Sequence, residues 1–91
     1  MKISYDENKS LRNIALRQLS FAKVVDFDWE RAIVREDVRF NYSEQRYVAY
    51  GYLEERLHCL CFTPVYDGIR VISFRKANKR EIRDYEQTIN K

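Results

Sequence analysis

Apolar and polar residues alternate along much of the chain, and this alternation predicts a series of short strands. Ile3 and Tyr5 alternate with polar neighbours and indicate a first strand. Further strands are expected in four later segments: 32–37, 46–53, 57–63 and 69–75. Three charged residues, 54–56, separate two of these segments and predict a hairpin. Asp67 and Gly68 indicate the next turn.

Helical spacing of apolar residues, together with capping residues, predicts three helices. Asp6 and Ser20 are typical N-caps, and Asn78 with Glu81 fits a capping box. The expected apolar faces are formed by three sets of residues: Leu11, Ile14 and Ala15; Phe21, Val24 and Val25; Ile82, Tyr85 and Ile89. The order of elements predicts one α+β domain, residues 1–91, with a small antiparallel sheet, two N-terminal helices and one C-terminal helix.

The composition is that of a globular protein, and it indicates a reduced, cytoplasmic one. Charged residues make up 34% of the 91 residues, and no apolar run approaches the ~20 residues that span a bilayer. The N-terminus has no secretory signal. Cys59 and Cys61 share a strand face, where a disulfide has poor geometry, and His58 is the one histidine. We therefore expect two core cysteines, no bound metal and no cofactor.

The positive charge of the chain is concentrated at its end. Residues 69–91 hold seven basic and three acidic residues, a net charge of +4, whereas residues 1–68 hold ten basic and eleven acidic ones, a net charge of −1. Such an end attracts a polyanion through counterion release. It is equally typical of a solvated helix with ordinary surface charges, and the composition leaves both interpretations open.

Two arginines lie within the last predicted strand. Strict alternation places Arg70, Ile72 and Phe74 on one face and the residues between them, with Arg75, on the other. Both faces are mostly apolar, so the strand is expected to be central and partly covered on both sides. An arginine in that setting either pairs with a carboxylate or faces a cleft where its guanidinium group meets phosphate.

Six segments of the chain resemble, in order and spacing, the BrnT family of toxins from type II toxin–antitoxin systems. They are YDENK, LSF, DFDWERA, YSEQRYVAYG, RLHCLCFT and IRVISFRKANKRE. The resemblance implies a fold similar to that of RelE and ParE toxins, and a ribonuclease that halts translation. It also implies a hetero-oligomer with a BrnA-like ribbon-helix-helix antitoxin.

The chain departs from the family pattern at two places. Leu16, Arg17 and Gln18 stand where family members commonly carry Lys-His-Gly, and Ser43 stands in a segment where Tyr-Gly-Glu is usual. Loss of that histidine would weaken or alter catalysis if it takes part in the reaction. Gln18 in place of glycine asks the helix to end without its usual left-handed residue.

A ribonuclease can work without a metal when a base activates the 2′-hydroxyl and cations stabilise the phosphate. Arg70 and Arg75, joined by Arg46, are the candidates for phosphate stabilisation. The candidates for the base are Glu44, His58 and Tyr85. Each has a structural alternative: Glu44 pairs with Arg46 across a turn, His58 is a core residue, and Tyr85 packs in the last helix. The expected ligands of neighbouring RNA phosphates are Lys76, Lys79 and Arg80.

Three functions compete at this point. The first is a metal-independent endoribonuclease toxin. The second is a binding module for the antitoxin or for nucleic acid, with its catalytic activity weakened. The third is a poison of DNA gyrase like the ParE toxins, which the resemblance implies share this fold.

Overall fold

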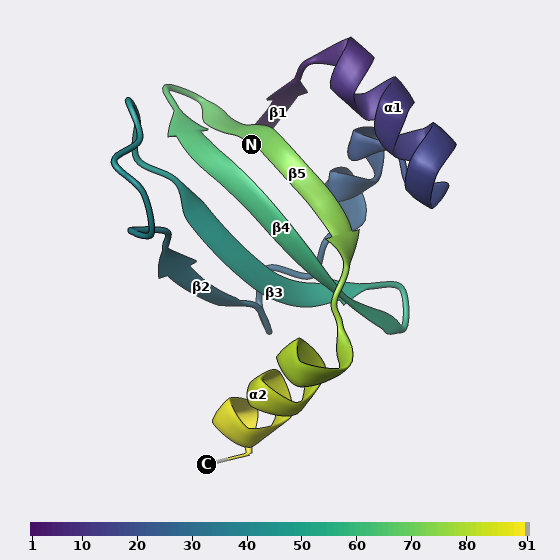
Figure 1. Cartoon of the computed structure of the whole chain (residues 1–91), viewed down its shortest axis with the longest axis vertical. Helices are drawn as coiled ribbons and strands as arrows, with labels where there is room; N and C mark the ends of the chain where they lie inside the picture. Colours follow the sequence, from purple (N-terminus) through teal and green to yellow (C-terminus); the bar gives the residue numbers. More distant parts are fainter. Residues whose placement is uncertain (91) are drawn as a thin grey trace.

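The computed structural model describes residues 1–90, so Lys91, counted in the charge above, lies outside the described residues. Figure 1 shows a twisted sheet with a helix at each end of the chain. The elements in chain order are β1 (Lys2–Tyr5), α1 (Glu7–Arg17), the 3₁₀ helix η1 (Phe21–Asp26), β2 (Ile33–Glu36), β3 (Tyr47–Leu53), β4 (Arg56–Val65), β5 (Gly68–Lys76) and α2 (Lys79–Ile89). The α+β class is confirmed. Neither α-helix among residues 1–90 is long and apolar enough to cross a membrane.

The sheet has five strands in the order β1-β5-β4-β3-β2. The strands β2 to β5 pair antiparallel, but β1 runs parallel to β5, with Ile3 opposite Ile69. The prediction of a purely antiparallel sheet is therefore wrong. The alternation within the four residues of β1 predicts a strand, but it contains no information about whether the partner strand runs parallel or antiparallel. Gly68 permits the pairing, because a Cβ at that position would collide with the Lys2 carbonyl oxygen.

One face of the sheet carries the main core. Phe21 and Val24 of η1, with Phe27 after it, pack against buried residues of the strands. Those strand residues are Ala49, Leu53, Leu60, Phe62, Ile69, Val71 and Phe74. Ser20 caps η1 as expected, by accepting a hydrogen bond from the Ala22 amide. The second predicted helix is thus a 3₁₀ helix of six residues, and its Val25 is exposed rather than buried.

Helix α1 is attached to this core by polar groups. Asp6 caps it as predicted, but the buried residues of the helix are Ser10 and Asn13. The Asn13 amide donates hydrogen bonds of 2.9 Å to the carbonyl oxygens of Leu19 and Phe74, and Ser10 Oγ accepts one from the Phe21 amide. The predicted apolar face is wrong: Leu11, Ile14 and Ala15 are exposed. Buried backbone groups at this junction need partners, and the side chains that supply them turn inward.

Helix α1 ends at a residue in the left-handed conformation, although the sequence has no glycine at that position. Gln18 adopts φ 58° and ψ 35° at the C-cap, and its amide donates to the Ile14 carbonyl oxygen. Gln18 therefore takes the place of the usual glycine at some cost in backbone strain.

Strand β5 contains a bulge that changes which of its residues share a face. Cys61 lies opposite Ser73 but Phe62 lies opposite Val71, which leaves Ile72 as the extra residue. Ile69, Val71 and Phe74 therefore all reach the core. The faces expected from strict alternation are wrong beyond the bulge. Arg70 and Arg75, five positions apart, lie on the same face of the sheet, opposite the core.

Helix α2 covers one end of that second face. Its capping box is present as predicted, with Asn78 and Glu81 bonding reciprocally. Tyr85 is buried with Leu57 and Ala77, and Ile82 packs against this small cluster. Ile89, expected on the same stripe, is 49% exposed, so that part of the prediction is wrong.

We predict that Asn13→Ala lowers the free energy of unfolding by about 2 kcal/mol, or roughly 10 °C in Tm, because two carbonyl oxygens lose their donor. Thermal and urea unfolding would measure the change. The control is Arg12→Ala, an exposed neighbour on the same helix that is expected to stay within about 0.5 kcal/mol of wild type. Equal losses for the two variants would contradict the role given to the Asn13 amide.

Candidate nucleic-acid interface

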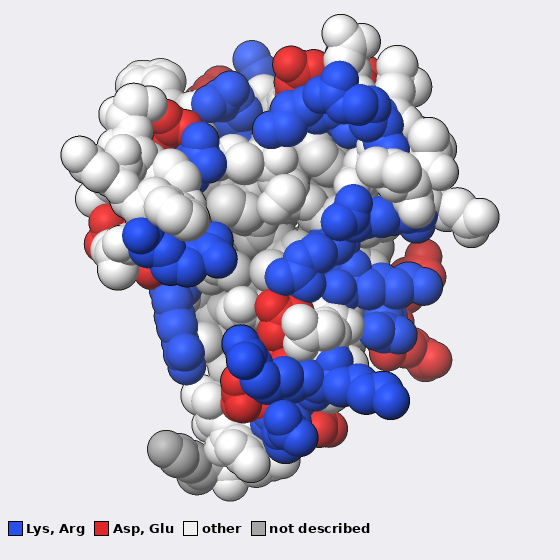
Figure 2. Space-filling model, in the orientation of Figure 1, with Lys and Arg blue, Asp and Glu red and all other residues white. Residues whose placement is uncertain are grey.

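The part of the second sheet face that α2 leaves uncovered forms a groove of about 770 Å³. Its floor includes Val48, Tyr50, Cys59, Cys61 and Ser73, from the three central strands. Five arginines line it, and we call it the arginine groove: Arg35, Arg39, Arg46, Arg75 and Arg80. Figure 2 shows Lys and Arg side chains on several sides of the paler centre of this face. Its size is that of pockets that hold small ligands or single nucleotides.

A cluster of three charged side chains lies at one end of the arginine groove. Glu44 Oε1 is 3.6 Å from Arg70 Nη2 and 3.4 Å from Arg46 Nε. The Ser43 hydroxyl donates a 2.7 Å hydrogen bond to the other carboxylate oxygen. That hydrogen bond, with the charges of the two arginines, holds the pKa of Glu44 below its ordinary value. The structure thus brings together three predicted site residues, from the loop before β3 and from β5.

Arg46 is only partly satisfied within this cluster. Its guanidinium carbon lies 4.2 Å from the centre of the Tyr42 ring, a cation–π contact. Its Nε is buried and makes no hydrogen bond with any residue that the structure describes. Its pairing with Glu44 at 3.4 Å is thus electrostatic without a well-formed hydrogen bond, which leaves donor capacity on the guanidinium group for a phosphate oxygen.

Arg75 is held by a carboxylate. Its Nη1 and Nη2 donate hydrogen bonds of 2.8 and 2.9 Å to the two oxygens of Glu81, which also accepts from the Asn78 amide. These contacts lower the pKa of Glu81 to about 2, with the Arg75 hydrogen bonds as the largest cause. Tyr50 lies 3.4 Å from the same carboxylate, and burial raises the pKa of its hydroxyl to about 12. The structural alternative considered for Arg75 is therefore present: the pair joins β5 to α2.

His58 lies on the other face of the sheet from the arginines. It is 4% exposed, its ring lies 5.3 Å from that of Phe74, and its Nδ1 is 2.8 Å from the Arg56 carbonyl oxygen. Burial lowers the pKa of the imidazole, so the ring is neutral and Nδ1 carries the proton that the carbonyl accepts. It lines a second pocket together with Arg17, Gln18, Lys76 and Arg75, and Arg75 lines the arginine groove as well. Sequence reasoning had grouped it with arginines that lie on the opposite face.

Tyr85 is engaged in packing. Its hydroxyl donates a 2.7 Å hydrogen bond to the Arg31 carbonyl oxygen, and the residue is 5% exposed. The three residues expected to hold RNA phosphates lie around the junction of β5 and α2. Arg80 lines the arginine groove, Lys76 lines the pocket of His58, and Lys79 is exposed in the first turn of α2.

The two cysteines are free and contribute to the floor of the groove, and the prediction of a core position is confirmed for Cys59, which is among the buried apolar residues. Cys59 is buried and Cys61 is half-buried. Burial raises the pKa of both thiols, which keeps them protonated and weakly nucleophilic at neutral pH.

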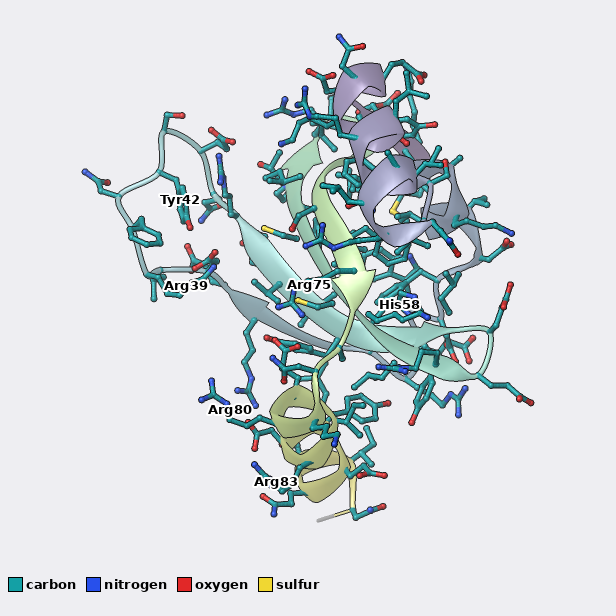
Figure 3. The ribbon with its side chains drawn as sticks, turned by 45° about the vertical axis from the view of Figure 1, so that its right-hand side comes forward. Arg39, Tyr42, His58, Arg75, Arg80 and Arg83 are labelled. Atoms are coloured by element: carbon teal, nitrogen blue, oxygen red, sulfur yellow. The ribbon has the colours of Figure 1, made fainter. Side chains whose placement is uncertain are left out.

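Sequence reasoning identified Glu44 and Arg46 in the loop between β2 and β3, but it missed Arg39 and Tyr42 in the same loop and Arg35 before it. Arg35 lines the groove from β2, and Arg39 and Tyr42 line it from the loop. Figure 3 labels the latter two on that loop. Asp37 organises this loop, and Arg39 holds its pKa far below the ordinary value. The signal was present as aromatic residues interleaved with arginines in VRFNYSEQR, a pattern typical of nucleic-acid contacts, but only Glu44 and Arg46 of this segment were among the predicted site residues.

The protein is a small α+β domain whose mixed sheet carries several arginines over one face. Such a surface is suited to binding a polyanion. The family model of the ribonuclease toxin BrnT of type II toxin–antitoxin systems matches residues 5–81. The match spans most of the chain, which therefore belongs to the BrnT family. Membership of a type II family implies an antitoxin partner. Comparison with curated proteins and with solved structures finds no match, so the likeness to RelE stays a prediction.

We predict that Glu81 gives the protein stability that acid removes. Its pKa falls from 4.5 to about 2 on folding, so the contribution is complete above pH 5 and is lost as the pH falls toward 2. Glu81→Gln should lower Tm by roughly 5–10 °C at pH 7, with the difference from wild type shrinking steadily toward pH 2. Thermal unfolding across this range measures it, with Glu86→Gln, an exposed residue of the last turn, as control. A constant difference across the range would mean that the Glu81 carboxylate is not the titrating group.

Proposed function

We propose that the chain is an endoribonuclease toxin that cleaves RNA without a metal ion, at the cluster of Glu44, Arg46 and Arg70. The observation that carries the proposal is the position of one ionised carboxylate between two arginines at the end of a basic groove. Inhibition of translation would follow from the cleavage of messenger RNA.

The reaction needs only these groups, the RNA and water. Glu44 takes the proton of a 2′-hydroxyl, and the 2′-oxygen attacks the adjacent phosphorus. Arg46 and Arg70 stabilise the negative charge that builds on the phosphate oxygens. The bond from phosphorus to the 5′-oxygen breaks, and that oxygen takes a proton from water. The hydroxide formed takes the proton that Glu44 holds, which restores the carboxylate. The products are a 2′,3′-cyclic phosphate and a 5′-hydroxyl.

Glu44 is the best placed of the three candidate bases. It lies within 3.6 Å of two arginines, and its side chain is 31% exposed, so an RNA hydroxyl can reach it. His58 lies on the core face of the sheet, and the Tyr85 hydroxyl already donates to a backbone carbonyl. The low pKa of Glu44 keeps it ionised at physiological pH, although it also weakens the carboxylate as a base.

Arg75 has a supporting role in this proposal. Glu81 neutralises its charge, so Arg75 fixes the start of α2 and with it the position of Arg80 over the groove. Arg80, with Lys76 and Lys79, would bind phosphates of neighbouring nucleotides. This neutralisation is also the observation that favours the alternative function, a binding module with weak or no catalysis.

The antitoxin in this proposal is a ribbon-helix-helix protein of the BrnA type. Its silencing segment would be acidic or helical and would cover the arginine groove and the exposed side of α2. The groove is lined by five arginines and three carboxylates, so it has an excess of positive charge. An acidic segment would neutralise this excess.

Replacing the proposed base should abolish most of the activity without unfolding the protein. We expect Glu44→Gln to lower single-turnover cleavage by about a hundredfold or more, the scale of a lost general base, and Arg70→Ala to have an effect of similar size. Arg83→Ala, on α2 away from the sheet in Figure 3, should cut RNA as wild type does. A folded Glu44→Gln protein with full activity would remove Glu44 from the mechanism.

The products distinguish this chemistry from metal-assisted hydrolysis. Cleavage of a labelled RNA should continue in excess EDTA and leave a 2′,3′-cyclic phosphate, because the 2′-oxygen is the nucleophile. End-group analysis of the fragments checks this. Activity that disappears on chelation and returns with Mg²⁺ would rule out the side-chain mechanism. The absence of cleavage under every condition would support the binding module instead.

A further inference from the structure

An aromatic ring stands exposed beside the arginine groove without a packing role in the core. Phe40, in the loop between β2 and β3, is 68% exposed. Burying such a side chain is normally favourable, so a loop that presents one to solvent forgoes that stabilisation. The same loop supplies Arg39, Tyr42 and Arg46 to the groove.

The loop holds this ring in a defined place. The Asp37 side chain, only 1% exposed, accepts hydrogen bonds of 2.9 Å from Nε and Nη2 of Arg39 and one of 3.1 Å from the Tyr42 hydroxyl. Phe40 lies between the two residues that Asp37 fixes. Its ring meets that of Tyr42 edge to face, with centres 5.8 Å apart. The ring is thus presented by an ordered loop.

Cations flank both aromatic rings. The Arg39 guanidinium carbon lies 5.9 Å from the centre of the Phe40 ring, and that of Arg46 lies 4.2 Å from the centre of the Tyr42 ring. We call the four residues Arg39, Phe40, Tyr42 and Arg46 the aromatic ledge. At its inner end the ledge shares Arg46 with the cluster of Glu44 and Arg70.

Alternating aromatic rings and guanidinium planes suit unpaired nucleobases. Each base has a π-face that stacks on an aromatic ring or an arginine, and one such contact contributes about 1–3 kcal/mol. Bases within a duplex are stacked on one another and cannot take this position. A base on the ledge would place its own phosphate near Arg46.

We propose that the aromatic ledge is a binding site for an unpaired nucleobase, and that Phe40 is the residue on which the base stacks. This proposal rests on the proposed function, because it supplies the substrate class for the same site: single-stranded RNA with a base next to the cleaved phosphate turned outward. A protein partner with an apolar side chain could also cover Phe40. The flanking arginines favour the nucleobase, because they add stacking surface and attract phosphate.

The test measures binding separately from cleavage. A labelled single-stranded 2′-O-methyl oligonucleotide cannot be cut by its own 2′-hydroxyl, so fluorescence anisotropy gives its Kd for the full chain even if the protein is active. Phe40→Ala should weaken binding about 5- to 100-fold, the fold-change equivalent of the stacking contribution. Phe40→Leu should lose nearly as much, because it keeps apolar area without a π-face, and Phe40→Trp should bind as well as wild type.

Two controls sharpen the result. Val25→Ala changes an equally exposed apolar residue on η1, which packs against the core face of the sheet away from the ledge, and it should leave Kd unchanged. A duplex of the same sequence should bind with an affinity that does not depend on Phe40. A third probe is an oligonucleotide that lacks the one base expected to stack on Phe40. Wild type should bind this abasic oligonucleotide as weakly as Phe40→Ala binds the intact one.

Equal Kd values for wild type and Phe40→Ala overturn the nucleobase site. If wild type still cleaves RNA in that case, the proposed function is supported independently. Loss of antitoxin binding by Phe40→Ala with unchanged oligonucleotide binding also overturns it and assigns the ring to the protein partner. Wild type that binds the oligonucleotide through Phe40 but cuts no RNA supports the site and rejects the catalytic proposal. The two proposals therefore fail separately.

Discussion

The bulge at Ile72 is the constraint on which both faces of the sheet depend. Strand β5 must send Ile69, Val71 and Phe74 into one core, and their spacing changes from two positions to three between Val71 and Phe74. One extra residue absorbs the change. The same insertion brings Arg70 and Arg75 to the opposite face, where strict alternation would have separated them. The packing of the core and the placement of charge therefore have one cause.

Glu81 connects that face to the last helix. Its carboxylate accepts from both Arg75 nitrogens and from the Asn78 amide, so a helix cap and an ion pair share one group. Because the pair is half-buried and bidentate, it is stronger than an ordinary surface salt bridge. The concentration of charge at the junction of β5 and α2 is thus in part structural. The arginines that remain for a polyanion lie on several elements around the groove.

The proposed nuclease site combines residues of the central strands with residues of an ordered loop. The central strands form the floor of the groove and hold Arg70, while the loop from 37 to 46 supplies Glu44, Tyr42 and Arg39. A loop tied down by a buried carboxylate can position side chains as a strand does and still present them to solvent. Membership of a family of ribonuclease toxins supports the proposal that RNA is the ligand of this surface.

The sequence by itself determined the elements whose causes are local. The strands, the caps at Asp6 and Ser20 and the capping box at Asn78 depend on neighbours within a few positions, and each formed as predicted. Membership of the family was visible in the order of its segments, and Arg46, Arg70 and Glu44 were identified as candidates. Their grouping remained one possibility among several.

Only the tertiary structure decided the rest, because it depends on residues distant in the chain. The parallel pairing of β1 and the inward orientation of the Asn13 side chain depend on residues more than sixty positions away. The bulge, which fixes the face on which each arginine lies, arises from the joint packing of β4 and β5 against one core. Alternation along a strand gives relative faces only while the strand is regular, so the position of His58 on the face opposite Arg70 could be seen only in the fold.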